Sequence, residues 1–157
     1  MKQVGDSAPR FKLADTEGKN VRLEDLIRSE SGVIAFFKVS CPTCQYTFPF
    51  LERLHQAFAG RVIGISQDSV KETKDFASRF GITFPLLLDV DDYKVSREYS
   101  LTTVPSIFLI EKDGSITFTA EGWAKDDIQQ IAAKLADKQS PPAIFKPNES
   151  VQAFKAG

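Results

Sequence analysis

The chain has 157 residues, 42% hydrophobic and 26% charged, values typical of a single soluble globular domain. Its 20 basic residues balance 21 acidic ones, and at a net charge of -1 we expect no nucleic-acid partner. No apolar run approaches the roughly 20 residues of a membrane span, and the N-terminus lacks the apolar core of a secretory signal. We therefore expect a cytoplasmic protein. If a leader or anchor has been removed, an extracytoplasmic location is the alternative.

Hydrophobic patterns predict alternating strands and helices. A buried strand at 33–37, VIAFF, is followed by helical spacing of apolar residues from Pro42 to about Ala59. Further along the chain we expect a strand at 61–67, a helix at 69–80, a strand at 83–89, a short helix at 92–99, strands at 106–111 and 115–120, and a helix at 125–137. This order predicts an α/β fold with helices on both faces of a central sheet and an antiparallel hairpin at Asp113-Gly114.

The last stretch of the chain, residues 138–157, has no convincing period and contains Pro141, Pro142 and Pro147. We expect one domain over residues 1–137, followed by this proline-containing tail. The tail is expected to be extended or loosely docked, and a functional lid is the alternative.

Both cysteines of the chain lie in CPTC, directly after the strand at 33–37. A disulfide closing so short a loop would restrain the unfolded chain little. A structural zinc site needs four Cys or His ligands, and the chain has only Cys41, Cys44 and His55 of these types, so we expect no metal. We also expect no cofactor. A redox pair is favoured, and two buried, inert cysteines are the alternative.

The start of a helix favours a thiolate, because unpaired N–H groups and the positive end of the helix dipole face it. Cys41 is therefore the expected nucleophile, and Cys44, on the same helical face, would resolve a mixed disulfide. Further along, Thr103-Val104-Pro105 precedes the strand at 106–111. Its proline is either an ordinary strand-entry residue or the site of a cis bond, and spacing leaves both open.

These motifs together carry a family resemblance. CPTC after a buried strand, Pro49 in the next helix and TTVPSIFLIEKDGSI downstream resemble thioredoxin-fold thiol:disulfide oxidoreductases of the TlpA/ResA type, within the redoxin (AhpC/TSA-like) superfamily. The match begins with VGDSAPRFKLADTEGKNVRLEDL and continues to about residue 137. It implies a thioredoxin-like three-layer α/β/α sandwich, a mixed central sheet and an N-terminal β extension over residues 1–31.

The resemblance also implies a site and partners. Cys41 would attack and Cys44 resolve, as the redox-active pair, and Val104-Pro105 would be a cis pair facing them. The implied partners are protein thiols or disulfides and an upstream electron donor or acceptor, and we expect a monomer. The residues expected to bind substrate are Pro42, Thr43, Val104, Pro105 and Trp123.

Two residues depart from the family pattern. Members usually carry Trp where this chain has Ser40, and often an acidic residue where it has Thr47. These departures concern the shape of the site and its handling of protons.

Two other functions are alternatives. A peroxiredoxin-like peroxidase would need Thr or Ser three residues before its nucleophile and Pro seven before it, but for Cys41 these positions hold Lys38 and Ile34. A copper-binding chaperone could use the two soft thiolates. Related copper carriers, however, pair a longer CxxxC with a downstream His.

Overall fold

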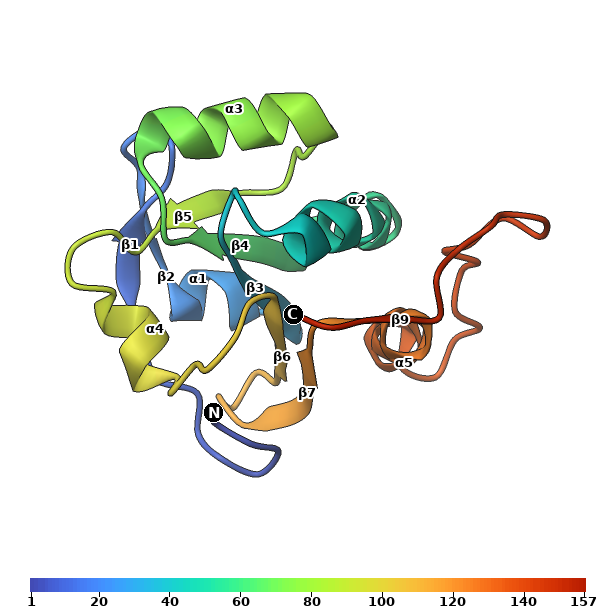
Figure 1. Cartoon of the computed structure of the whole chain (residues 1–157). Helices are drawn as coiled ribbons and strands as arrows, with labels where there is room; N and C mark the ends of the chain where they lie inside the picture. The colour runs from blue at the N-terminus through green and yellow to red at the C-terminus, as the bar shows by residue number, and fades with distance from the viewer.

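A computed structural model describes residues 1–157 and contains the predicted alternation of strands and helices (Figure 1). Every strand and helix expected between residues 33 and 137 is confirmed to within a few residues. The elements are β1 (Lys12–Ala14), β2 (Asn20–Arg22), α1 (Leu23–Ile27), β3 (Gly32–Phe37), α2 (Pro42–Ala57), β4 (Val62–Ser66), α3 (Val70–Phe80), β5 (Leu86–Leu88), α4 (Lys94–Glu98), β6 (Ser106–Ile110), β7 (Ile116–Glu121), β8 (Trp123–Ala124), α5 (Lys125–Ala136) and β9 (Phe154–Lys155).

The central sheet is mixed, as expected. Its five strands lie in the order β5-β4-β3-β6-β7, with β3 in the middle. β4 runs parallel to β3 and β5, whereas β6 runs antiparallel to both β3 and β7. The predicted hairpin joins β6 to β7, and Gly114 adopts a positive φ of 88° in its turn.

Two apolar clusters cover the two faces of this sheet. On β3, Val33, Ala35 and Phe37 face a cluster supplied mainly by α2, α3 and α5. Ile34 and Phe36 face the opposite cluster, which α1, α4 and the N-terminal residues complete. Because side chains alternate along a strand, one fully buried strand contributes to both cores. The expected three-layer α/β/α arrangement is confirmed.

The N-terminal region packs on the face opposite α2. β1 and β2 form an antiparallel hairpin, and an isolated bridge joins Asp15 to Leu87 on β5. Ala8 and Phe11 are buried in the cluster that contains α4. Residues 1–31 thus complete one of the two cores. The assignment of residues 1–137 to one domain remains a prediction.

Helix α2 carries both cysteines and is anchored by its apolar face. Pro42 occupies the first turn, where no backbone donor is required, and the helix continues through Pro49. Phe48, Leu51 and Leu54 recur at helical spacing and are fully buried against the sheet. This packing holds the start of α2 just beyond the end of β3.

The tail over residues 138–157 is extended, and it is anchored at defined points. It leaves the end of α5 and returns along the molecule, so that β9 pairs with β8 (Figure 1). Ile144 is only 8% exposed and belongs to the core cluster that includes α2 and α5. The hydrogen-bonded guanidinium of Arg53 on α2 lowers the pKa of Glu149 to about 2, so this carboxylate is charged at neutral pH.

Gly64 on β4 allows α2 to pack closely on the sheet. A Cβ added there would lie 2.6 Å from Leu86 Cδ2 and 3.1 Å from Phe48 Cε2. We predict that Gly64→Ala lowers the free energy of unfolding by about 1 to 3 kcal/mol through overpacking, measured by urea denaturation. In a Leu86→Val background the cost should be smaller, since the nearest atom is gone. Equal costs in both backgrounds would contradict this account.

Candidate active site

The sulfur of Cys41 caps the N-terminus of α2. Cys41 has extended backbone (φ −79°, ψ 115°), and its Sγ accepts a hydrogen bond from the Cys44 backbone N–H at 3.1 Å. A side-chain oxygen of Ser, Asp or Asn usually fills this position. The sulfur therefore lies where helix N–H groups and the helix dipole both favour negative charge.

The second cysteine has a different environment. Cys44 is 0% exposed, whereas Cys41 is partly exposed. Burial is the main factor that raises the pKa of the Cys44 thiol, and its hydrogen bond with Cys41 and the nearby charge of Asp68 act in the same direction. Cys44 is therefore a protonated thiol at neutral pH, and Cys41 is the residue of the pair that is partly exposed to solvent.

The loop before β6 meets the cysteines from the other side of the site. The Val104-Pro105 peptide bond is cis, as the family resemblance implied. The Cys41 thiol donates to the Val104 carbonyl oxygen over an Sγ to O distance of 3.6 Å. Two residues 63 positions apart are thus brought into contact.

The other residues expected to bind substrate lie nearby but differ in exposure. Pro42 is exposed, while Thr43 is buried and donates from its hydroxyl to the Ala156 carbonyl. Trp123 is only 1% exposed, because the tail lies against it and the Gln152 carbonyl accepts its indole N–H.

The two departures from the family pattern also differ in environment. Ser40 is exposed. Thr47 is fully buried, and its hydroxyl donates to the Thr43 carbonyl one turn earlier, at 2.7 Å. The position that often holds an acid in the family therefore holds a neutral group turned back to its own helix.

Sequence reasoning missed the residues that hold the loop before Cys41. The Val39 N–H donates to Asp68 Oδ2 at 2.8 Å, and the Gln45 side chain donates to the Val39 carbonyl at 2.8 Å. The only signal in the sequence was the position of Asp68, just after the end of a strand. That strand, β4, pairs in parallel with β3, the strand that leads to Cys41. Asp68 fixes this loop and adds negative charge near Cys44.

No three His, Cys, Asp or Glu side chains come together in a way that could hold a metal ion. None of the helices has both the length and the apolar character needed to cross a membrane.

The sequence matches the AhpC/TSA family over residues 4–119. It is 34% identical over 132 residues to the thiol-disulfide oxidoreductase ResA of Geobacillus thermodenitrificans, a match that covers 81% of this chain and 75% of the relative. The thioredoxin domain of a thiol-disulfide oxidoreductase from Bacteroides vulgatus is similar in structure, with a TM-score of 0.74, 23% identity and coverage of 85% and 98% of the two chains. Peroxidoxin BcpB from Mycobacterium tuberculosis also has a TM-score of 0.74, at 24% identity and coverage of 89% and 100%. At these identities the two structures show the fold alone.

The burial of Cys44 leads to a test with the other cysteine removed. In Cys41→Ser, we predict that iodoacetamide alkylates Cys44 only slowly near pH 8, with a rate that still rises above pH 9. Each unit by which the pKa is raised lowers the thiolate fraction about tenfold. The same variant unfolded in urea provides the control and should react as an ordinary thiol. Equal rates in the folded and unfolded chains would refute the prediction.

Proposed function

Since the chain belongs to the AhpC/TSA family and is a thiol-disulfide oxidoreductase, we propose that Cys41 attacks the disulfide of a protein substrate and Cys44 resolves the intermediate. The difference between the two sulfurs carries this proposal. Cys41 is partly exposed at the N-terminus of α2, where its sulfur accepts the Cys44 N–H, whereas Cys44 is buried. A substrate disulfide can approach the first sulfur and not the second.

The proposed reaction has two exchange steps. The Cys41 thiolate attacks one sulfur of the substrate disulfide, forming a mixed disulfide and releasing a substrate thiolate, which takes up a proton. Cys44 then loses its proton and attacks the Cys41 sulfur, which forms the Cys41–Cys44 disulfide and releases the second substrate thiol. Two electrons pass from the cysteine pair to the substrate, and the reverse sequence oxidises substrate thiols.

Forming the mixed disulfide also favours the second step. The charge of a Cys41 thiolate is one of the factors that oppose ionisation of Cys44. Once the Cys41 sulfur is bonded to substrate it carries no charge, so Cys44 loses its proton more easily. The loss of charge on Cys41 in the first step thus favours ionisation of Cys44 for the second step.

We propose that the substrate chain lies against Pro42, Thr43, Val104, Pro105 and Trp123. In support, the Val104 carbonyl is within 3.6 Å of the Cys41 sulfur, where it can accept a hydrogen bond from a substrate backbone. Thr43 and Trp123 both bind the extended chain of residues 152–156, so an extended substrate chain can contact the same two side chains. We call these five residues the substrate surface.

Protein thiols are the substrate class that the family implies. An upstream protein that exchanges electrons with the Cys41–Cys44 pair completes the proposed cycle, and a reduction potential measured against glutathione would give its direction. A monomeric state and a cytoplasmic location remain predictions, with an extracytoplasmic location as the alternative. Sedimentation analysis and cell fractionation would test them.

Thiol peroxidase activity is a minor alternative, favoured by the AhpC/TSA match and by the fold shared with a peroxidoxin. Against it, Lys38 and Ile34 stand where such an enzyme needs Thr or Ser and Pro. Peroxide turnover would test this alternative. Copper titration would test the weaker one, a copper chaperone.

The roles of the two cysteines predict opposite behaviour in single variants. Cys41→Ser should abolish disulfide exchange, because only that sulfur reaches substrate. Cys44→Ser should accumulate a mixed disulfide, because nothing resolves it. Non-reducing gels and mass spectrometry after incubation with a protein disulfide would detect the adduct. Adducts through Cys44 in Cys41→Ser, with none through Cys41 in Cys44→Ser, would reverse the roles.

A further inference from the structure

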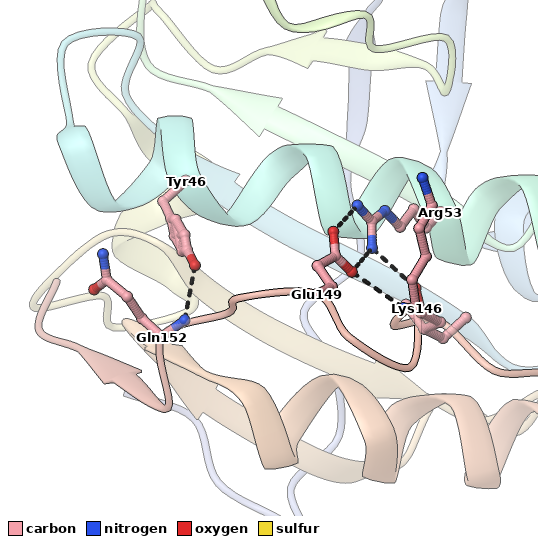
Figure 2. Close-up of polar contacts among 6 residues, drawn as sticks. Tyr46, Arg53, Lys146, Glu149 and Gln152 are labelled. Atoms are coloured by element: carbon pink, nitrogen blue, oxygen red, sulfur yellow. Dashed lines mark hydrogen bonds and ion pairs between the residues drawn. The ribbon is translucent and has the colours of Figure 1, made fainter.

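The C-terminal part of the tail follows α2 back toward the cysteines. Arg53 on α2 holds it through a two-pronged ion pair, with Nη1 donating to Glu149 Oε1 at 2.7 Å and Nη2 to Oε2 at 2.6 Å (Figure 2). Arg53 also donates to the Ile144 carbonyl at 3.1 Å. A paired guanidinium and carboxylate fix both distance and orientation, so this contact sets the path of the residues that follow.

Two aromatic side chains then bind the backbone of Gln152. Its N–H donates to the Tyr46 hydroxyl at 2.9 Å (Figure 2), and its carbonyl accepts the Trp123 indole N–H at 2.7 Å. The rings of Tyr46 and Trp123 pack edge to face, with centroids 5.2 Å apart. At Gln152 the tail is thus bound through main-chain groups, which any polypeptide carries.

Beyond Gln152 the tail becomes a strand. β9 pairs antiparallel with β8, placing Lys155 opposite Trp123, and the Lys125 N–H donates to the Ala153 carbonyl at 2.9 Å. A Cβ added at Gly157 would lie 2.7 Å from the Val104 carbonyl oxygen, so the chain there touches the loop beside Cys41.

We propose that residues 149–157, the covering segment, occupy the substrate surface in cis, and that an extended polypeptide substrate must displace them before its disulfide reaches Cys41. The inference rests on the proposed function, because it assumes that this surface binds the substrate chain. Thr43, Val104 and Trp123 are the three residues of that surface that the segment contacts. Strand addition at the edge of β8 defines the partner as a chain in β conformation.

The way the covering segment is held suits displacement. Phe154, the largest side chain of β9, is 67% exposed, so the strand buries little apolar area of its own. The hydrogen bonds that the covering segment makes to Tyr46, Trp123 and Thr43 all use its backbone groups. The backbone of a substrate can form the same hydrogen bonds in their place. A small disulfide makes no such contacts and needs only the partly exposed Cys41 sulfur.

Trp123 reports whether the segment is in place. It is the only tryptophan in the chain and is 1% exposed, with its indole N–H bonded to Gln152. Release of the segment would expose this ring to water and shift its fluorescence emission to longer wavelength.

The test uses the full chain with one substitution at each end of the segment. Glu149→Lys places a cation against Arg53, and Gly157→Ala crowds the Val104 carbonyl. The matched control is Asp75→Lys on α3, which removes another ion pair, Lys71–Asp75, from an exposed surface. Exchange is measured with insulin as the protein disulfide and hydroxyethyl disulfide as the small one.

We expect both segment variants to shift Trp123 emission and to raise kcat/KM for insulin by up to about tenfold. That factor corresponds to a substrate surface open about a tenth of the time in the natural chain. The rate with hydroxyethyl disulfide should stay within about twofold, and Asp75→Lys should change neither rate nor emission.

Other outcomes would overturn the proposal. A red shift with an unchanged insulin rate would mean that the segment does not block substrate, and a red shift with a lower insulin rate would make it part of the binding surface. Emission that stays constant in both variants would show a segment too firmly held for a substrate to displace. A natural chain that neither reduces these disulfides nor oxidises the corresponding thiols would instead refute the proposed function, so the two failures are distinguishable.

Discussion

The hydrogen bond from the Cys44 N–H to the Cys41 sulfur connects the fold to its chemistry. It exists only because α2 begins at Pro42, and that position is fixed by the apolar face of the helix. Phe48 and Leu51 are buried against the sheet, so moving the helix by one residue would expose apolar area worth a few kcal/mol. The core thus determines which sulfur receives the helix N–H groups and which is enclosed.

The different roles that we propose for the two cysteines follow from that constraint. A helix turn places Cys44 on the same face as Cys41 but deeper, among core residues, where a charge is costly. Burial therefore keeps the Cys44 thiol neutral. In the proposed reaction it stays unreactive until the mixed disulfide brings a sulfur within its reach. With Thr47 hydrogen-bonded to its own helix, no carboxyl on α2 helps Cys44 to ionise, and Asp68 opposes it.

Sequence reasoning recovered the parts of this structure that local pattern encodes. The buried strand before CPTC, the amphipathic α2 and the Asp113-Gly114 hairpin all follow from periodicity and turn chemistry, and the cis bond followed from the resemblance. The path of the tail could not be predicted, because it depends on single contacts between distant residues. Arg53 and Glu149 are 96 positions apart, and neither belongs to a repeating pattern. The burial of Trp123 could not be predicted for the same reason, since nothing in the sequence indicated that the tail would cover it.

The tail links the stability of the fold to access to the site. An indole ring is too large and too apolar to leave exposed without cost, and Trp123 reaches full burial only with the tail against it. The same tail therefore completes the core next to α5 and covers Thr43 and Val104. A chain that takes the place of residues 149–157 must cover Trp123 as well as reach Cys41. If the substrate displaces the tail as we propose, substrates that offer both an extended backbone and an apolar side chain at that point would restore what the tail provides. This requirement would give the site a basis for selecting among protein disulfides.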